Sequence, residues 1–433
     1  MLKYFHKETE LLGTVPNVLA ECSFTKKLEG RVKISGSKNA SLAMLAATLL
    51  TDEECIIKNV PRLDDVFVLL ALLEKLGKKI SFRGNIVIIR GAVKRQILPE
   101  GLSRKLRASV LVMGPILASK GSGVFALPGG CALGERPIDI HIMGLRAFGA
   151  RYEICGGKMN FKRKILHPAH IHLPFPSVGA TENILMAASL IPGKSVISNV
   201  AREPEIINLV RFLNAMGSHI KICGSTYEVY GVRNLHGAQF SVMPDRIESG
   251  TFLLAAAAIG GAIKIIGAES GHLTVLIKKL AQTGVQIGEK RGILSVKAAR
   301  CPQPADISTA PYPGFPTDLQ PLWAVYMLRA AGKSKITEKV FPARFMYVDE
   351  LKRLGADMKL KASVLTVGKS CLNGAHLIAC DLRAAAAMII AGLMANGTTR
   401  VGGLRHLFRG YENFFEKLQM LKANVSIRQT KKK

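Results

Sequence analysis

A short phrase recurs along the whole chain, in which an apolar stretch is followed by a glycine and a new strand. The glycine of this phrase occupies five positions: Gly77, Gly149, Gly217, Gly284 and Gly355. Successive copies lie 67 to 72 residues apart, and a sixth, weaker copy places Lys422 in the glycine position. Such regular self-similarity indicates one structural unit repeated six times, with a period longer than that of the common solenoid repeats.

Each copy begins with a short polar phrase that opens an alanine- and leucine-rich helix. Serine, threonine and aspartate in these phrases suit helix N-caps. A short strand, a polar link and a second amphipathic helix follow, and the repeated glycine ends that helix. The expected unit is therefore helix, strand, helix and returning strands. Since 433 residues suit two domains, we expect an α/β fold with three units in each domain.

The composition describes a globular chain that attracts anions. Hydrophobic residues make up 48% and charged residues 21%, and the formal net charge is +29. This charge permits nucleic-acid binding, but it also fits an ordinary solvated basic surface. Aromatic residues make up only 6%, which does not favour stacking on single-stranded bases. Nucleic acid is therefore not expected as a partner.

Neither a metal site nor a membrane segment is expected. The eight cysteines are scattered without metal-ligand spacing, which favours a reducing compartment. The first 30 residues lack a signal-peptide pattern. The longest apolar run, at 384–394, is too short to span a bilayer. These features predict a soluble, cytoplasmic protein.

Basic residues gather in the polar phrases that open helices or link the units. Because a cation opposes the dipole at a helix N-terminus, several such residues suggest a ligand. For any single one of them, ordinary surface charge is an equally simple explanation. A small ligand with a phosphate and a carboxylate would call for bidentate arginines and a lysine. The residues in question are Lys38, Arg107, Arg136, Arg344, Arg383 and Arg409.

A glycine-rich segment at 121–139 surrounds Cys131 and has the composition of a mobile lid. Arg136 nearby would lower the thiol pKa towards a range useful for proton exchange. A lone cysteine is more often inert packing, and only the polar, glycine-rich setting favours the chemical role. Asp318 has a similar ambiguity: it is either a helix N-cap or a carboxylate that accepts a substrate proton.

Eight phrases, spread over nearly the whole chain and in the same order, resemble the UDP-N-acetylglucosamine 1-carboxyvinyltransferase family. The resemblance implies two inverted α/β domains of the inside-out barrel type found in EPSP synthase, each with three units. It implies an N-terminal catalytic domain at 38–243 and a C-terminal domain formed by 1–37 and 244–433. The phrases are ISGSKNA at 34–40, LPGGCALGERPID at 127–139, PSVGATEN at 176–183, AREPEI at 201–206, FPTD at 315–318, RFMYV at 344–348, DLRA at 381–384 and RGYE at 409–412.

The resemblance also implies a reaction and a set of residue roles. The reaction transfers enolpyruvate from phosphoenolpyruvate to the 3-hydroxyl of UDP-N-acetylglucosamine and releases phosphate, without a metal or organic cofactor. Cys131 would protonate the methylene carbon and would be the residue that fosfomycin attacks, while Asp318 would act on the sugar hydroxyl. The phosphoenolpyruvate residues would be Lys38, Asn39, Arg136, Arg344, Asp381, Arg383 and Arg409. The UDP-sugar residues would be Arg107, Arg136, Pro137, Ile138, Asp139, Ile140, Ser177, Val178, Gly179, Asp318 and Val340.

Two phrases depart from the family pattern. Phe175 and Pro176 stand where some members carry a lysine-containing sequence, and Pro342 and Ala343 replace the Glu-Asn pair that commonly precedes the arginine. Two rival functions also remain. One is the sister transferase that acts on shikimate 3-phosphate, against which the Pro-Gly-Gly-Cys lid argues. The other is a basic nucleic-acid-binding relative without catalysis.

Overall fold

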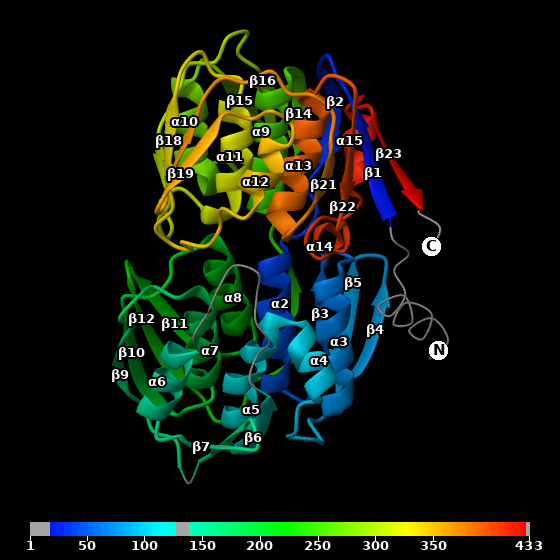
Figure 1. The fold of residues 1–433 in the computed structure, drawn as a ribbon. Coiled ribbons are helices and arrows are strands. Elements are labelled where there is room, and N and C mark those ends of the chain that lie inside the picture. The colour runs from blue at the N-terminus through cyan, green and yellow to red at the C-terminus, as the bar shows by residue number, and fades with distance from the viewer. Residues whose placement is uncertain (1–17, 127–137, 164, 430–433) are drawn as a thin grey trace. The chain divides into compact units, whose positions relative to one another are not determined.

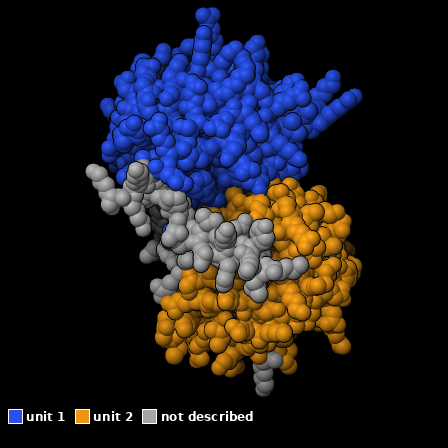
Figure 2. Space-filling model, turned by 90° about the vertical axis from the view of Figure 1, so that its right-hand side faces the viewer, with its two compact units in different colours: residues 1–35, 132–134, 244–433 blue, residues 36–131, 135–243 orange. Residues whose placement is uncertain are grey.

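The structure is a computed structural model that describes residues 18–126, 138–163 and 165–429 (Figure 1). Two compact units divide the chain, and Figure 2 colours them separately. Unit 1 contains residues 18–35 and 244–429, and unit 2 contains the described residues between 36 and 243. Unit 1 is therefore discontinuous in sequence.

Unit 1 places helices inside and sheets outside (Figure 1). Its long helices α9, α11 and α13 pack against one another and are almost entirely buried. The helices and 3-10 turns are α9 (Arg246–Ile259), η3 (Ser270–Leu273), α10 (Thr274–Gln282), η4 (Thr317–Leu319), α11 (Gln320–Met327), α12 (Tyr347–Lys352), α13 (Leu382–Met394), α14 (Arg405–Phe408) and α15 (Phe414–Met420). The strands are β1 (Val18–Ser23), β2 (Leu28–Lys33), β14 (Gly261–Ile266), β15 (Gln286–Lys290), β16 (Ile293–Lys297), β17 (Ile307–Ser308), β18 (Ser334–Thr337), β19 (Met358–Lys361), β20 (Val364–Val367), β21 (His376–Ile378), β22 (Thr398–Gly402) and β23 (Val425–Gln429).

Unit 2 follows the same plan, with α2 and α7 buried at its centre. Its helices and 3-10 turns are α2 (Lys38–Ala47), η1 (Thr48–Leu50), α3 (Asp64–Leu76), α4 (Glu100–Lys105), η2 (Arg107–Val112), α5 (Met113–Lys120), α6 (Asp139–Ala147), α7 (Val178–Ala188) and α8 (Pro204–Ala215). The strands are β3 (Cys55–Lys58), β4 (Lys79–Arg83), β5 (Ile86–Arg90), β6 (Ser122–Ala126), β7 (Arg151–Cys155), β8 (Lys158–Lys162), β9 (His170–His172), β10 (Gly193–Ser198), β11 (His219–Cys223), β12 (Thr226–Gly231) and β13 (Gln239–Ser241).

One sheet pattern recurs in both units. Among the described residues, five sheets have four strands, of which three are mutually antiparallel neighbours and the fourth is a parallel strand at one edge. The four-stranded orders are β11-β12-β10-β9, β13-β3-β5-β4, β15-β16-β14-β2, β17-β18-β20-β19 and β21-β22-β1-β23. The sixth sheet, β6-β8-β7, has three strands, and a parallel bridge between Ile97 and Val124 takes the place of the fourth. The overall fold is thus mixed α/β, with the same small sheet built six times.

The first strand of the chain belongs to the last sheet. β1 pairs antiparallel with β22 and with β23, so that Ala20 lies opposite Val401 on one side and Ile427 on the other. β2 pairs in parallel with β14, in the sheet that follows the return of the chain to unit 1. Residues nearly 400 positions apart in sequence therefore share one sheet.

The repeated glycines end helices, as the sequence predicts. All five have positive φ, from 91° at Gly355 to 115° at Gly77, a conformation that L-residues with a Cβ avoid. The sixth copy adopts the same conformation with a lysine, because Lys422 has a φ of 63°. Among the described residues, no helix is both long enough and apolar enough to cross a bilayer.

We predict that Gly77→Ala destabilises unit 2 more than Gly217→Ala does. Both substitutions incur the positive-φ penalty of about 1–2 kcal/mol. A Cβ at Gly77 would also lie 2.9 Å from the backbone nitrogen of Lys94, whereas at Gly217 the nearest atoms belong to the side chain of His236 at 3.1 Å. Chemical denaturation of the two variants measures the difference, and equal losses of unfolding free energy would contradict this account.

Candidate active site

In unit 1, Asp318 lies between two buried arginines. Its Oδ1 is 2.7 Å from Nη1 of Arg344, and its Oδ2 is 3.0 Å from Nη2 and 3.3 Å from Nε of Arg383. The arginine side chains are only 3% and 2% exposed, whereas that of Asp318 is 27% exposed. The carboxylate is therefore the part of this cluster that faces solvent.

Helix starts position two of these three side chains, those of Asp318 and Arg383. Asp318 lies in η4, directly before α11, and Arg383 is the second residue of α13. The side chain of Asp381 caps α13 by accepting hydrogen bonds from the backbone N–H groups of Arg383 and Ala384. An arginine so near a helix N-terminus opposes the helix dipole. The negative charge of Asp318 offsets this unfavourable interaction with the dipole, and a second anion would offset it further.

Arg383 retains its charge although it is buried. Burial disfavours the charge of Arg383, but Tyr411 and Asp318 outweigh it and hold the arginine pKa above its ordinary value. Its Cζ also lies 5.1 Å from the centre of the Tyr411 ring. Within the described part of the chain, Nη1 of Arg383 and Nε of Arg344 are buried without a hydrogen-bond partner. Buried donors in this state commonly indicate a ligand or an ordered water.

Arg409 and Asp381 lie near a third titratable group, His406. Burial lowers the pKa of this histidine, Arg409 lowers it further, and Asp381 opposes the change. Arg409 follows α14 directly. The structure therefore brings Asp318, Arg344, Arg383 and Asp381 together and places Arg409 next to His406.

In unit 2, Lys38 is the first residue of α2, whose N-cap is Ser37. The Nζ of Lys38 is 3.6 Å from Oδ2 of Asp65, and the two side chains are only 13% and 8% exposed. Asn39 follows it in the same helical turn. Lys38 therefore places a largely buried ammonium group at the start of α2.

A second cluster in unit 2 surrounds His141 of α6. Asn183 of α7 donates an amide N–H to its Nδ1 at 2.9 Å, because an amide nitrogen cannot accept. Burial, reinforced by the charge of Arg107 and opposed by that of Asp139, lowers the pKa of His141 from 6.5 to about 4. A Cβ at Gly179 would lie 3.2 Å from the imidazole ring. Arg107, Asp139 and Gly179, all predicted for the UDP-sugar site, therefore meet around a neutral histidine.

The remaining predicted residues of this unit lie at the starts of the same two helices. Ser177 caps α7 by accepting from the backbone N–H of Ala180, and Val178 follows it. Ile138 and Ile140 flank Asp139 at the start of α6. Cys131, Arg136 and Pro137 lie outside the described residues, as do all of residues 127–137 of the predicted lid at 121–139.

Sequence reasoning missed several residues that hold these clusters. His141 follows Asp139 by two positions, and Asn183 ends the PSVGATEN phrase. Both residues therefore lie in or directly beside a family motif. Glu338, whose carboxylate accepts from Thr317 next to Asp318, carries no such signal. The described residues contain no group of three or more His, Cys, Asp or Glu side chains placed to hold a metal.

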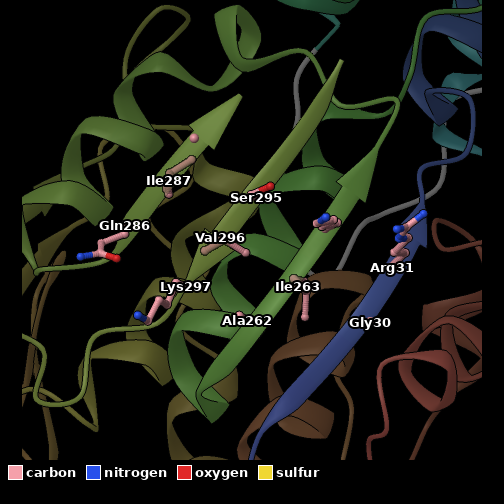
Figure 3. Close-up of a pocket in the computed structure, with 11 residues that line it drawn as sticks. Gly30, Arg31, Ala262, Ile263, Gln286, Ile287, Ser295, Val296 and Lys297 are labelled. Carbon is pink, nitrogen blue, oxygen red and sulfur yellow. The ribbon is translucent and has the colours of Figure 1, made fainter. Parts of the chain in front are cut away.

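Surface shape alone does not indicate these clusters. A groove of about 550 Å³ lies on the exposed face of the β15-β16-β14-β2 sheet (Figure 3). Its rim carries Arg31, Lys264 and Lys297. None of the predicted site residues lines it.

The sequence of this chain matches a known family over most of its length. The profile of the family described as EPSP synthase (3-phosphoshikimate 1-carboxyvinyltransferase) matches residues 23–418. A UDP-N-acetylglucosamine 1-carboxyvinyltransferase 1 from Carboxydothermus hydrogenoformans is 45% identical over 400 residues, covering 92% of this chain and 95% of that protein. The protein of that name from Caldanaerobacter subterraneus is 46% identical, over 92% and 96%.

The chain belongs to the UDP-N-acetylglucosamine 1-carboxyvinyltransferase family. More distant members of the enolpyruvyl transferase fold agree with it in structure. The enolpyruvyl transferase NikO from Streptomyces tendae superposes with a TM-score of 0.88 at 22% identity, over 96% of this chain and all of that one. An EPSP synthase from Acinetobacter baumannii superposes with a TM-score of 0.75 at 19% identity, over 95% of this chain and all of that one.

We predict that His141 contributes a pH-dependent term to the stability of this family member. Because its folded pKa lies below 6.5, the unfolded chain binds an additional proton as the pH falls from 6.5 towards 4, and stability is lost in that window. Between pH 7 and pH 5 the loss is about 2 kcal/mol. In His141→Asn, whose Oδ1 can accept from Asn183, this part of the pH dependence disappears.

Chemical denaturation at pH 7 and at pH 5 measures the effect. His219→Asn is the control, because His219 is an exposed residue of β11. If both variants retain the wild-type pH dependence, His141 titrates normally and the description of its environment is wrong.

Proposed function

We propose that this chain transfers the enolpyruvyl group of phosphoenolpyruvate to the 3-hydroxyl of UDP-N-acetylglucosamine and releases phosphate. This reaction is the first committed step of peptidoglycan precursor synthesis. The names and the 45–46% identity of its relatives support the assignment. The structural observation that supports it most directly is the position of Asp318, whose partly exposed side chain is held by two buried arginines.

The proposal includes a finer architecture and a cellular location. We assign the fold to an inside-out α/β barrel with six repeated units, three in each domain, which the recurring sheet pattern supports. We assign the enzyme to the cytoplasm. The free state of all seven cysteines among the described residues is compatible with that location.

Fixed cations prepare phosphoenolpyruvate for the reaction. Arg344 and Arg383 bind its carboxylate, and Asp381 holds the start of α13 from which Arg383 projects. The phosphate is bound by Lys38, Asn39, Arg136 and Arg409. Cations held rigidly by the protein stabilise developing charge without reorganising during the reaction.

The chemical steps then follow from three proton transfers. Cys131 donates a proton to the methylene carbon, and positive charge develops on the neighbouring carbon. The sugar 3-hydroxyl attacks that carbon while Asp318 accepts its proton, which gives a tetrahedral intermediate. Loss of phosphate from this intermediate, with loss of a proton from the methyl group, restores the double bond in the product.

Asp318 suits the role of base because the arginines orient it without enclosing it. Oδ1 accepts from Arg344 and Oδ2 accepts from Arg383, while 27% of the Asp318 side chain remains exposed. Arg107, Asp139, Ser177 and Gly179 bind the UDP-sugar, with Arg136 to Ile140, Val178 and Val340 completing that site. The neutral His141 orders this region and carries no charge of its own at neutral pH.

A phosphate-release assay tests the proposed reaction against its closest rival. The matching family profile is described by the 3-phosphoshikimate reaction, so shikimate 3-phosphate is the second candidate acceptor. We expect phosphate release from phosphoenolpyruvate with UDP-N-acetylglucosamine and none with shikimate 3-phosphate. The reverse preference would reject the assignment. Binding of a generic oligonucleotide without phosphate release would favour the non-catalytic alternative.

We predict that Asp318→Asn lowers kcat by about 10²-fold or more, because general-base catalysis contributes on that scale. The dissociation constant for UDP-N-acetylglucosamine should change far less, since most of the sugar nucleotide is bound elsewhere. Asp349→Asn is the control, because that side chain is 89% exposed. A loss confined to sugar affinity would assign Asp318 to binding alone.

We predict that Cys131→Ser loses most of its turnover and all covalent labelling by fosfomycin, since a serine hydroxyl is a much weaker acid and nucleophile than a thiol. Mass spectrometry of the intact protein measures the labelling. Cys155→Ser serves as the control, because Cys155 is an exposed, free cysteine. Unchanged turnover and labelling in the Cys131 variant would reject this role.

A further inference from the structure

Glu338 is a buried carboxylate whose partners are all uncharged. The residue is 1% exposed and lies directly after β18. It accepts four hydrogen bonds, from the hydroxyls of Thr309 and Thr317 and from the backbone N–H groups of Val340 and Phe341, at 2.7 to 2.9 Å. Among the described residues, no lysine or arginine forms an ion pair with it. Burying a carboxylate costs free energy. The four hydrogen bonds that compensate for this cost indicate that Glu338 has a specific role.

The two oxygens of Glu338 serve different segments. Oε1 accepts from Thr309, Val340 and Phe341 and so fixes the turn between β18 and Arg344. Among the described residues, Oε2 accepts from Thr317 alone, the residue before Asp318. The carboxylate therefore connects the segment that contains Asp318 to the segment that leads to Arg344.

The hydroxyl of Thr317 links Glu338 to Arg344. Because Thr317 donates its one proton to Glu338, its lone pairs are left to accept from Nη1 of Arg344 at 3.2 Å. The same Nη1 is 2.7 Å from Oδ1 of Asp318. A guanidinium Nη carries two N–H groups, so Thr317 and Asp318 together fix the direction of both.

A second route reaches Arg344 through Phe341. The backbone N–H of Arg344 donates to the carbonyl of Phe341 at 2.9 Å, and its Cζ lies 5.9 Å from the centre of that aromatic ring. Glu338 holds the backbone N–H of Phe341 in place. It also holds that of Val340, which is assigned to the UDP-sugar site. This support matters here because Pro342 and Ala343 stand directly before Arg344.

We propose that Glu338 is a positioning residue that orients Arg344 towards phosphoenolpyruvate and Asp318 towards the sugar hydroxyl, acting through the hydroxyl of Thr317. This inference rests on the proposed function, in which Arg344 and Asp318 contact the substrates. Glu338 itself touches neither substrate. Its carboxylate sets the direction of a hydroxyl proton, and that hydroxyl sets the direction of an arginine.

Two threonine variants separate positioning from simple structural support. Thr317→Val and Thr309→Val each remove one hydroxyl from Glu338, but only Thr317 also bonds Arg344. We expect Thr317→Val to lower kcat/KM for phosphoenolpyruvate about tenfold, while the dissociation constant for UDP-N-acetylglucosamine stays within about twofold. Thr309→Val should retain kcat/KM within about twofold, and Thr317→Ser, which keeps the hydroxyl, should restore the wild-type value. The expected tenfold decrease reflects the loss of one hydrogen bond to a charged group. Such a loss changes a rate or binding constant by roughly a factor of ten or more.

Thermal melting of each variant accounts for stability, and all assays run well below the lowest melting temperature. Glu338→Gln is the complementary test. Its amide would donate to Thr317 and so reverse the hydroxyl, which should lower kcat/KM at least as much as Thr317→Val does. Equal losses in the Thr309 and Thr317 valine variants, or none in Thr317→Val, would overturn the proposal.

Arg344→Lys and Asp318→Asn distinguish this result from a failure of the proposed function. If either variant retains full turnover, the proposed active site is wrong. If both lose turnover while Thr317→Val matches Thr309→Val, the site stands and only the role of Glu338 is rejected.

Discussion

The constraint on which the architecture depends is the complete burial of its central helices. α9, α11 and α13 of unit 1 pack against one another and present almost no side chain to solvent. Small residues such as the four consecutive alanines at 384–387 allow this close approach. A fully enclosed helix can expose polar chemistry only at its ends. The functional side chains accordingly lie at helix starts, where Arg383 begins α13, Lys38 begins α2 and Asp318 precedes α11.

A charged side chain at a helix end needs hydrogen-bonding or oppositely charged partners. These partners form the polar clusters. Asp318 links Arg344 to Arg383, Asp381 caps the helix that carries Arg383, and Glu338 fixes the turn before Arg344. In unit 2, burial and the charge of Arg107 lower the pKa of His141, and Asn183 donates a hydrogen bond to its Nδ1. Each cluster has a buried hydrogen-bond network around a more exposed reactive group. Such preorganisation keeps side chains at a fixed geometry before a substrate arrives.

The sequence predicted the fold more fully than the supports of the site. The spacing of the glycines correctly predicted where helices end. Gly77 and its counterparts have the positive φ that is typical of such ends. Periodicity could not foresee that β1 joins β22 and β23, because pairing across almost 400 residues leaves no local signal. Asp318, Arg344 and Arg383, which the family motifs name, lie in one cluster, and their roles in the site stay predictions. Glu338 was missed because a buried polar residue is recognised by its partners, which the sequence alone does not reveal. His141 was missed although it lies only two positions after Asp139.

The pairing of β1 with β22 and β23 sets an order for folding during synthesis. The described residues of unit 2 all lie between 36 and 243, so this unit can collapse before the rest of unit 1 leaves the ribosome. The sheet that contains β1 cannot close until Val425–Gln429 has been translated. Until then the N-terminal strand has an unpaired edge, and such edges are prone to pair with other chains. Nascent molecules that stall before residue 425 would therefore be the population most in need of a chaperone.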